Sequence, residues 1–216
     1  MTLSEIEQTA PGVWKITPSG GSAFFLREAY LSCLSPDVLE QSCRALTAAG
    51  ESSAACAFSD EEYADMLSAS LAYSAETLAM GYLARAEQCR TALTAKLGKK
   101  GLAAQDIERA LDYLEGCGYL DDRRFAGAWL RSRAINHAEG RLRLGAELAA
   151  RGIAREDARA ALDAFFSDHD EGDLCRKALE RGMKTCRDRN RLFRSLLRKG
   201  FTAAEITAAL RETELV

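Results

Sequence analysis

The sequence predicts a mainly helical protein built from tandem three-helix repeats, with a small N-terminal extension that contains β-strands. Three observations support this class: one phrase recurs three times, its leucines have helical spacing, and the first 35 residues have a different pattern. The copies begin at Arg90, Arg141 and Arg189, which lie 51 and 48 residues apart. A period of about 50 residues indicates one supersecondary unit used again.

Each copy reads as a helix, a glycine turn and a second helix. Two leucines follow the arginine at helical spacing, and a glycine preceded by a basic residue then ends the helix, because glycine adopts the left-handed C′ conformation without strain. The second helix starts at once, with an acidic residue in its first turn. The recurring positions are Arg90, Leu93, Leu97, Gly101, Leu102, Asp106, Ile107 and Leu111; Arg141, Leu144, Leu148, Gly152, Ile153, Asp157, Ala158 and Leu162; and Arg189, Leu192, Leu196, Gly200, Phe201, Glu205, Ile206 and Leu210.

A further helix is expected before each pair, over roughly residues 75–85, 122–134 and 173–183. Three helices per repeat follow. In the third copy Thr202 and Glu205 have capping-box spacing, whereas the first two copies have Ala103 and Ala154 at the cap position. We therefore divide the chain into an N-terminal extension (1–59), a first repeat with its lead-in helix (60–117), a second repeat (118–167) and a third repeat (168–216).

The N-terminal extension is predicted to hold a short β-hairpin and one helix. Residues 13–16 and 23–26 are apolar runs on either side of Pro18-Ser19-Gly20-Gly21, a turn signal. Pro36 opens a helix of about a dozen residues. Residues 50–59 form a small-residue connector, and the helix that begins at Asp60 is expected to bury Tyr63, Leu67, Leu71 and Leu78. No linker separates this helix from the repeats, so the extension should pack on the first repeat.

The junction Gly118–Ala134 lies between the first two repeats. Gly118 ends one helix, and Asp121 or Asp122 caps the next. We interpret this block as structural, with its large apolar side chains in the core: Tyr119, Leu120, Phe125 and Trp129.

Charge is distributed unevenly along the chain. Residues 1–81 hold 3 basic and 11 acidic side chains, a balance of −8, whereas residues 82–216 hold 26 basic and 21 acidic ones, a balance of +5. Twenty of those 26 are arginines, which favour bidentate contacts with carboxylates or phosphates. Solvation of the outer helix faces is the simpler explanation for most of them. The densest basic cluster contains Arg131, Arg133, Arg141 and Arg143, and it is the preferred contact surface.

Other classes of protein have little support in the sequence. Seven scattered cysteines and two histidines form no metal-binding motif, so we expect reduced thiols and no metal or other cofactor. No stretch is apolar enough to span a membrane and no secretion signal is evident, which favours the cytoplasm. Neither histidine has an evident nucleophile beside it, and no glycine-rich phosphate loop precedes a helix, so an enzyme is not expected.

The segments GYLDDRRFAGAWLRSRA (118–134) and GRLRLGAELAARGI (140–153) resemble the RecX family of bacterial RecA regulators. RTALTAKLGKKGL and RLFRSLLRKGF match more weakly, and the likeness covers roughly residues 75–215. The resemblance implies a curved, elongated array without catalytic activity, and the N-terminal piece is similar to an extension of some longer members. It also implies binding to the RecA nucleoprotein filament along its groove, with suppression of ATP hydrolysis, strand exchange and LexA cleavage in DNA repair, recombination and the SOS response.

We therefore expect a monomeric regulator whose repeats present arginines to acidic groups on RecA. The alternative is a helical module that competes for single-stranded DNA, which the modest charge of +5 and the few exposed aromatic residues disfavour. Single- or double-stranded DNA is a further candidate partner. The expected partner-binding residues are Arg131, Arg133, Arg141, Arg143, Arg90, Lys99, Lys100 and Arg151, and the expected structural residues are Gly118, Tyr119, Leu120, Asp121, Asp122, Phe125, Trp129, Gly101, Gly152 and Gly200.

Overall fold

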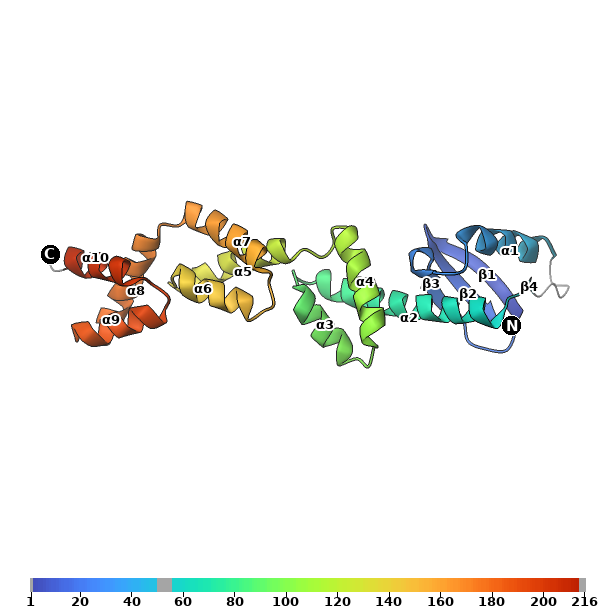
Figure 1. The fold of residues 1–216 in the computed structure, drawn as a ribbon, viewed down its shortest axis with the longest axis horizontal. Coiled ribbons are helices and arrows are strands. Elements are labelled where there is room, and N and C mark those ends of the chain that lie inside the picture. Colours follow the sequence, from blue (N-terminus) through green and yellow to red (C-terminus); the bar gives the residue numbers. More distant parts are fainter. Residues whose placement is uncertain (1, 50–55, 214–216) are drawn as a thin grey trace. The chain divides into compact units, whose positions relative to one another are not determined.

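The computed structural model describes residues 2–49 and 56–213, and it is mainly helical with a small N-terminal sheet, as predicted (Figure 1). The elements, in chain order, are β1 (Thr2–Ala10), β2 (Val13–Pro18), β3 (Phe24–Arg27), the 3-10 helix η1 (Glu28–Tyr30), α1 (Pro36–Ala49), β4 (Cys56–Ala57), α2 (Asp60–Leu83), α3 (Arg90–Gly98), α4 (Ala104–Gly116), α5 (Asp122–Asn136), α6 (Arg141–Ala149), α7 (Arg155–Asp168), α8 (Glu171–Met183), α9 (Arg189–Arg198) and α10 (Ala203–Thr213).

The chain forms two compact units. The first contains Met1–Arg85 and Leu93–Tyr119, and the second contains Ala86–Ala92 and Leu120–Val216. Helix α3 therefore begins in the second unit and continues in the first.

An antiparallel sheet of order β3-β2-β1-β4 forms the start of the first unit. The predicted hairpin is β2–β3, in which Trp14 faces Leu26. The sequence did not reveal β1, because a register shift between Leu3 and Glu5 breaks the alternation that marks a strand, and only Leu3 and Ile6 are buried. Of the predicted connector, residues 50–55 lie outside the described residues, and Cys56–Ala57 form β4.

Helix α2 begins where predicted, but the prediction of its buried side is wrong. A capping box starts it, with the backbone N–H of Ser59 donating to Glu62 at 2.8 Å and that of Glu62 to Ser59 Oγ at 3.2 Å. Tyr63 is half-buried, and the leucines expected inside are 39–51% exposed. Small or acidic side chains face inward instead, because alanines allow close packing and the acids have partners there. The buried residues are Asp65, Met66, Ala69, Ala72, Ala75, Glu76 and Ala79, and the exposed leucines are Leu67, Leu71 and Leu78.

The buried carboxylate of Glu76 joins three elements of the first unit. Arg27 of β3 donates to it twice, at 2.8 and 2.6 Å, and the Tyr30 hydroxyl donates at 2.9 Å. The Arg27 guanidinium also lies 4.8 Å from the ring centre of Tyr113 in α4. Arg109 of α4 donates to the Tyr30 carbonyl as well. The extension is thus bonded to the first repeat, as the absence of a linker predicted.

Asp65 performs a similar task for the segment that follows η1. Its carboxylate accepts hydrogen bonds of 2.9–3.0 Å from the backbone N–H groups of Ser32, Cys33 and Leu34. Burial acts to raise the pKa of Asp65, but these bonds and the charge of Arg109 outweigh it, so the pKa lies below its ordinary value.

This lowered pKa predicts a loss of stability in acid. Because the folded pKa is below the unfolded one, Asp65 stabilises the first unit above pH ~4, and this contribution disappears as the pH falls through the folded pKa. Asp65→Asn should lower the free energy of unfolding by about 1–3 kcal/mol at pH 7 and weaken its dependence on pH below ~4. In a Trp129→Phe background, Trp14 fluorescence reports urea unfolding of the first unit, because the chain has 2 tryptophans, one in each unit. An unchanged pH dependence would contradict this role.

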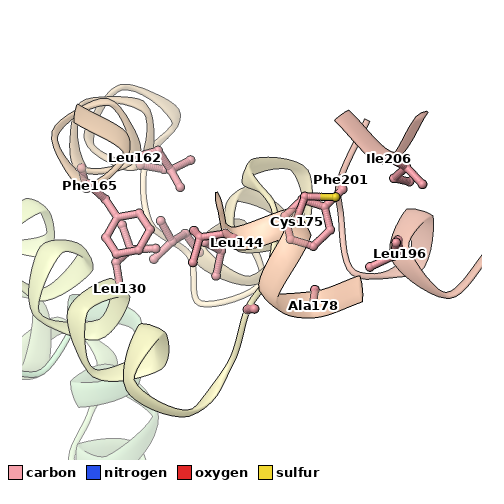
Figure 2. Packing of buried hydrophobic residues seen from close by; sticks show 14 of the residues in the cluster. Leu130, Leu144, Leu162, Phe165, Cys175, Ala178, Leu196, Phe201 and Ile206 are labelled. Atoms are coloured by element: carbon pink, nitrogen blue, oxygen red, sulfur yellow. The ribbon is translucent and has the colours of Figure 1, made fainter. Parts of the chain in front are cut away.

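The second unit contains two three-helix groups, α5–α7 and α8–α10, that share one apolar core. Figure 2 shows Leu130 of α5 and Phe165 of α7 pointing toward one another, with Leu144 of α6 between this pair and the side chains of α8–α10. Phe201, the apolar residue after the third glycine, is 1% exposed. The recurring leucines of the phrase are buried in all three copies.

The glycine turns have the geometry that the repeated phrase predicts. Gly101, Gly152 and Gly200 have φ of 84°, 78° and 86°. In the second and third copies the next N–H donates back across the turn, from Ile153 to the Leu148 carbonyl at 3.2 Å and from Phe201 to Leu196 at 3.3 Å. These are the long bonds of a Schellman ending, so the turn satisfies the carbonyls that the helix leaves free.

Two of these glycines also lie against the first turn of a helix in the copy before: Gly152 against α3, and Gly200 against α6. We call α3, α6 and α9 the middle helices, because each is the second of the three helices in its copy. A Cβ on Gly152 would lie 2.2 Å from Thr91 Oγ1, and one on Gly200 would lie 2.3 Å from the backbone nitrogen of Arg143. A Cβ on Gly101 would have no neighbour within 4 Å. The turn of one copy therefore docks on the middle helix of the copy before it, while the first copy lacks this contact among the described residues.

The neighbouring bonds repeat as well. The Cys89 thiol faces the Arg151 carbonyl at 3.6 Å, and the Gly140 N–H donates to the Lys199 carbonyl at 2.9 Å. In both cases the residue just before the first arginine of one copy is bonded to the basic residue just before the turn glycine of the following copy. The caps also follow the sequence: Thr202 and Glu205 form the capping box, and Ala103 and Ala154 make no side-chain cap bond.

Substitution of the glycines should separate their two roles. Gly101→Ala introduces only the positive-φ strain, roughly 1–2 kcal/mol. Gly200→Ala adds a clash with the backbone of α6 and should cost about 3 kcal/mol or more. Urea unfolding in a Trp14→Phe background measures the second change through Trp129, and the Trp129→Phe background measures the first through Trp14. Equal losses would show that the close approach is not a constraint.

Candidate functional site

A cluster of arginines lies where α5 ends and α6 begins. Arg133 donates to the buried Glu139 through Nε at 2.7 Å and Nη2 at 3.1 Å, and the Arg143 guanidinium forms a 2.9 Å ion pair with the same carboxylate. Burial acts to raise the pKa of Glu139, but Arg133 and Arg143 outweigh it, so the pKa is below its ordinary value. Glu139 therefore remains charged at neutral pH and holds both arginines.

The cluster extends along α6 to Arg151. Its guanidinium donates to Glu147 at 2.8 Å and lies 4.5 Å from the ring centre of Trp129, while Arg133 lies 5.8 Å from the same ring. We call this set the α5–α6 arginine cluster: Arg133, Arg143, Arg151, Glu139, Glu147 and Trp129. Three arginines and two glutamates leave a charge of +1, so it presents ordered guanidinium groups and not a bare cationic patch.

Arg141 does not belong to this cluster. It donates to Asp163 of α7 at 2.6 Å and to Glu171 of α8 at 2.9 Å, and it lies 4.7 Å from the ring centre of Phe166. These contacts make Arg141 a brace between three helices of the second unit. The arginines that the sequence predicted as one contact surface therefore do not all lie together, because Arg133 and Arg143 share Glu139 whereas Arg141 binds other carboxylates.

Arg131 lies in a third place, a cleft between α5 and α7 with a volume of about 440 Å³. The cleft is floored by small side chains of α7, and Arg123 and His169 also line it. The His169 ring stacks on Phe165 at a centroid distance of 4.3 Å. Asp121 and Asp168 line the cleft too, so its charge is mixed.

Nothing in the described part of the chain resembles a metal centre or a membrane span. No three histidine, cysteine or acidic side chains are grouped to hold a metal ion there. None of the described helices is long and apolar enough to cross a membrane. Free thiols are found at Cys33, Cys43, Cys89, Cys117, Cys175 and Cys186, and burial raises the pKa of Cys175 to about 11.

Comparison with known proteins identifies the family. The family model described as "RecX, second three-helix domain" matches residues 121–162, which include α5, α6 and the start of α7. The regulatory protein RecX of Treponema pallidum is 36% identical over 156 residues, 72% of this chain and 95% of that protein. The chain belongs to the RecX family. RecX of Xanthomonas citri is 38% identical over 136 residues, 62% of this chain and 83% of the relative.

Solved RecX structures share the fold. The crystal structure of a regulatory protein RecX matches 96% of this chain and 98% of its own, with a TM-score of 0.69 and 22% identity. RecX from Lactobacillus salivarius covers 68% of this chain and 98% of its own, with a TM-score of 0.60 and 20% identity. The relatives are named as regulatory proteins, and this RecX-family chain is a regulator, not an enzyme.

The matched RecX domain contains the GYLDD aspartates, which have structural tasks. Asp121 caps α5 by accepting from the Arg124 N–H at 2.9 Å. Asp122 accepts from the Arg90 N–H at the start of α3 at 2.8 Å. Gly118 has a φ of 74°, and the Tyr119 N–H donates across that turn to the Leu114 carbonyl at 2.9 Å.

The junction is less buried than the sequence predicted. Leu120 is core at 2% exposure, and Phe125 and Trp129 are half-buried against the core. Tyr119 is 53% exposed, so its prediction as core is wrong. As the residue after a left-handed glycine, it returns to the surface where the chain turns into α5.

The remaining predicted contacts are dispersed through the RecX fold. Arg90 lies at the start of α3 in the second unit, whereas the exposed Lys99 and Lys100 follow α3 in the first. Sequence reasoning did not single out the arginines of α9, although that helix contains no acidic residue. This lack of acids was the available signal.

Arg141 should contribute to stability more than its neighbours on the surface. Arg141→Ala removes two ion pairs and an aromatic contact, and because the pairs are partly exposed the second unit should lose only about 0.5–1 kcal/mol. Arg131→Ala, the matched control, should change the free energy of unfolding by less than about 0.5 kcal/mol. Trp129 fluorescence during urea unfolding of Trp14→Phe variants measures both. A larger loss for Arg131→Ala would contradict the assignment of Arg141 as the brace.

Proposed function

We propose that this protein regulates RecA by binding the RecA nucleoprotein filament and inhibiting its ATPase, recombinase and coprotease activities in DNA repair, recombination and the SOS response. The supporting observation is that the α5–α6 arginine cluster lies in the domain that the RecX family model matches. In this role the protein acts in the cytoplasm, as a monomer before it meets the filament.

The cluster is suited to binding acidic groups on a protein. Glu139 and Glu147 hold the guanidinium groups in fixed positions, so less side-chain freedom is lost when a partner carboxylate binds. Trp129 lies within reach of Arg133 and Arg151 and supplies an amphipathic surface beside them. Arginine and tryptophan are the residue types that contribute most at protein interfaces.

Tandem repeats also suit a filamentous partner. A filament presents the same surface at regular intervals, and repeated three-helix units can contact more than one copy of it. Contacts made by one chain add through effective concentration, so individually modest bonds give strong binding. Arg143 and Arg151 of the α5–α6 arginine cluster are the expected contact residues, and the brace Arg141 supports the surface indirectly.

The test is ATP hydrolysis by the cognate RecA on single-stranded DNA, with this protein titrated at a fixed excess of DNA. Inhibition well below one molecule per RecA subunit, unchanged by more DNA, is the expected result. Relief by added DNA would indicate competition for DNA instead. If equimolar protein did not inhibit at all, the proposed regulation of RecA would be wrong.

Arg143→Ala/Arg151→Ala tests the α5–α6 arginine cluster. The double variant should need at least roughly tenfold more protein for half-inhibition, since even one lost hydrogen bond to a charged group costs about 1.5–3 kcal/mol and about 1.4 kcal/mol is a factor of ten. Arg155→Ala/Arg159→Ala is the matched control, because it removes the same charge from exposed positions of α7. Inhibition by the first double variant at the concentration needed by the parent protein would reject this surface while leaving the regulatory role intact.

A further inference from the structure

Residues 184–199 are the most one-sidedly basic part of the chain. They contain seven basic side chains and one acidic side chain, a balance of +6: Lys184, Arg187, Arg189, Arg191, Arg194, Arg198 and Lys199 against Asp188. The Asp188 carboxylate caps α9, accepting from the N–H groups of Asn190 at 2.9 Å and Arg191 at 3.2 Å. It is therefore already occupied by the backbone.

Three of these arginines form a row along α9. Arg191, Arg194 and Arg198 are three and seven residues apart, which places them on one face of the helix. All three are exposed, and Leu192 and Leu196 bury the opposite side. No ion pair joins any of the three to an acidic side chain in residues 2–49 or 56–213. We call them the α9 arginine row.

Several other arginines of this unit are paired with acids. Arg141 has Asp163 and Glu171, Arg124 has Glu87, and Arg176 has Asp173 and Glu212. Near the row, Glu180 is an acid on the adjoining α8, and it lines a shallow depression together with Lys184 and Arg187. None of the three arginines of the row lines this depression.

The repeat shows that the fold does not need the charges of Arg194 and Arg198. Arg194 occupies the place of Ala95 in the first copy and Ala146 in the second, and Arg198 occupies the place of Lys99 and Ala150. The three alanines are exposed, so alanine satisfies the same helix surface. A requirement of ligand binding explains the arginines better than a requirement of folding.

The chemistry of the row fits phosphates. Seven residues of α-helix span about 10 Å, which is the axial length of roughly three phosphates on one DNA strand. Ser195 lies between the arginines, and the exposed Leu197 lies at the edge of the row. Without a large apolar anchor at its centre, the row lacks what a protein interface uses for affinity, whereas binding to phosphates depends on charge.

We propose that the α9 arginine row of the third repeat binds the phosphodiester backbone of nucleic acid, without sequence preference. This contact adds to the RecA-binding surface proposed above and adjoins it, because the Arg143 guanidinium donates to the backbone carbonyl of Arg198 at 3.2 Å. Because the row has no aromatic side chain for stacking, it should bind single strands and duplexes through the same phosphate contacts.

The test measures DNA binding without RecA, so it fails or succeeds independently of the proposed regulation. Fluorescence anisotropy of labelled 40-nucleotide poly(dT) and of a 40-base-pair duplex would be recorded with the full-length protein at about 50–200 mM salt. Arg191→Ala/Arg194→Ala/Arg198→Ala should weaken binding roughly tenfold or more at the lowest salt and reduce the salt slope by about 2 to 3. Circular dichroism should be unchanged, since alanine favours the helix.

The matched control is Arg155→Ala/Arg159→Ala/Arg211→Ala, which removes the same charge from exposed positions of α7 and α10 and should bind like the parent. The proposal is overturned if the parent protein does not bind either probe at low salt, or if both triple variants bind equally well. It is also overturned if the row variant binds DNA normally but loses inhibition of RecA, because the row would then contact an acidic protein.

Discussion

The second unit depends on one backbone constraint, the left-handed glycine that ends each middle helix. Gly152 and Gly200 reverse the chain tightly enough to bury Ile153 and Phe201, and they leave no side chain in the way of the neighbouring copy. The same atom that glycine lacks would therefore disturb both the turn and the contact between copies. A Cβ is excluded twice, once by φ and once by packing, which explains why the residue recurs with the leucines.

The first unit is held by buried acids instead of repeated turns. Glu76 and Asp65 lie on the inner face of α2, where Arg27, Tyr30 and backbone N–H groups satisfy them. A buried carboxylate with several donors is specific about what surrounds it, because each lost partner leaves a costly unpaired charge. This arrangement orders the irregular segment after η1, which contributes little apolar surface of its own.

Helical periodicity, turn residues and the recurring phrase predicted the helices, the glycine turns and the hairpin, because these features are encoded within about 20 residues. The side of α2 that is buried could not be found this way, since its partners come from β3 and from the segment after η1. The arginines show the same limit. Arg141 and Arg143 are two residues apart, yet they point to different carboxylates, Asp163 and Glu139, and only the packing of α7 and α8 decides this.

Asp188 has a meaning beyond its role as a helix cap. In the first two copies the residue before the repeat arginine, Cys89 or Gly140, is bonded to the next copy, whereas in the third Asp188 bonds to its own helix. The carboxylate of Asp188 supplies the acceptors from within its own copy, so the start of α9 is complete without a bond to any other helix pair.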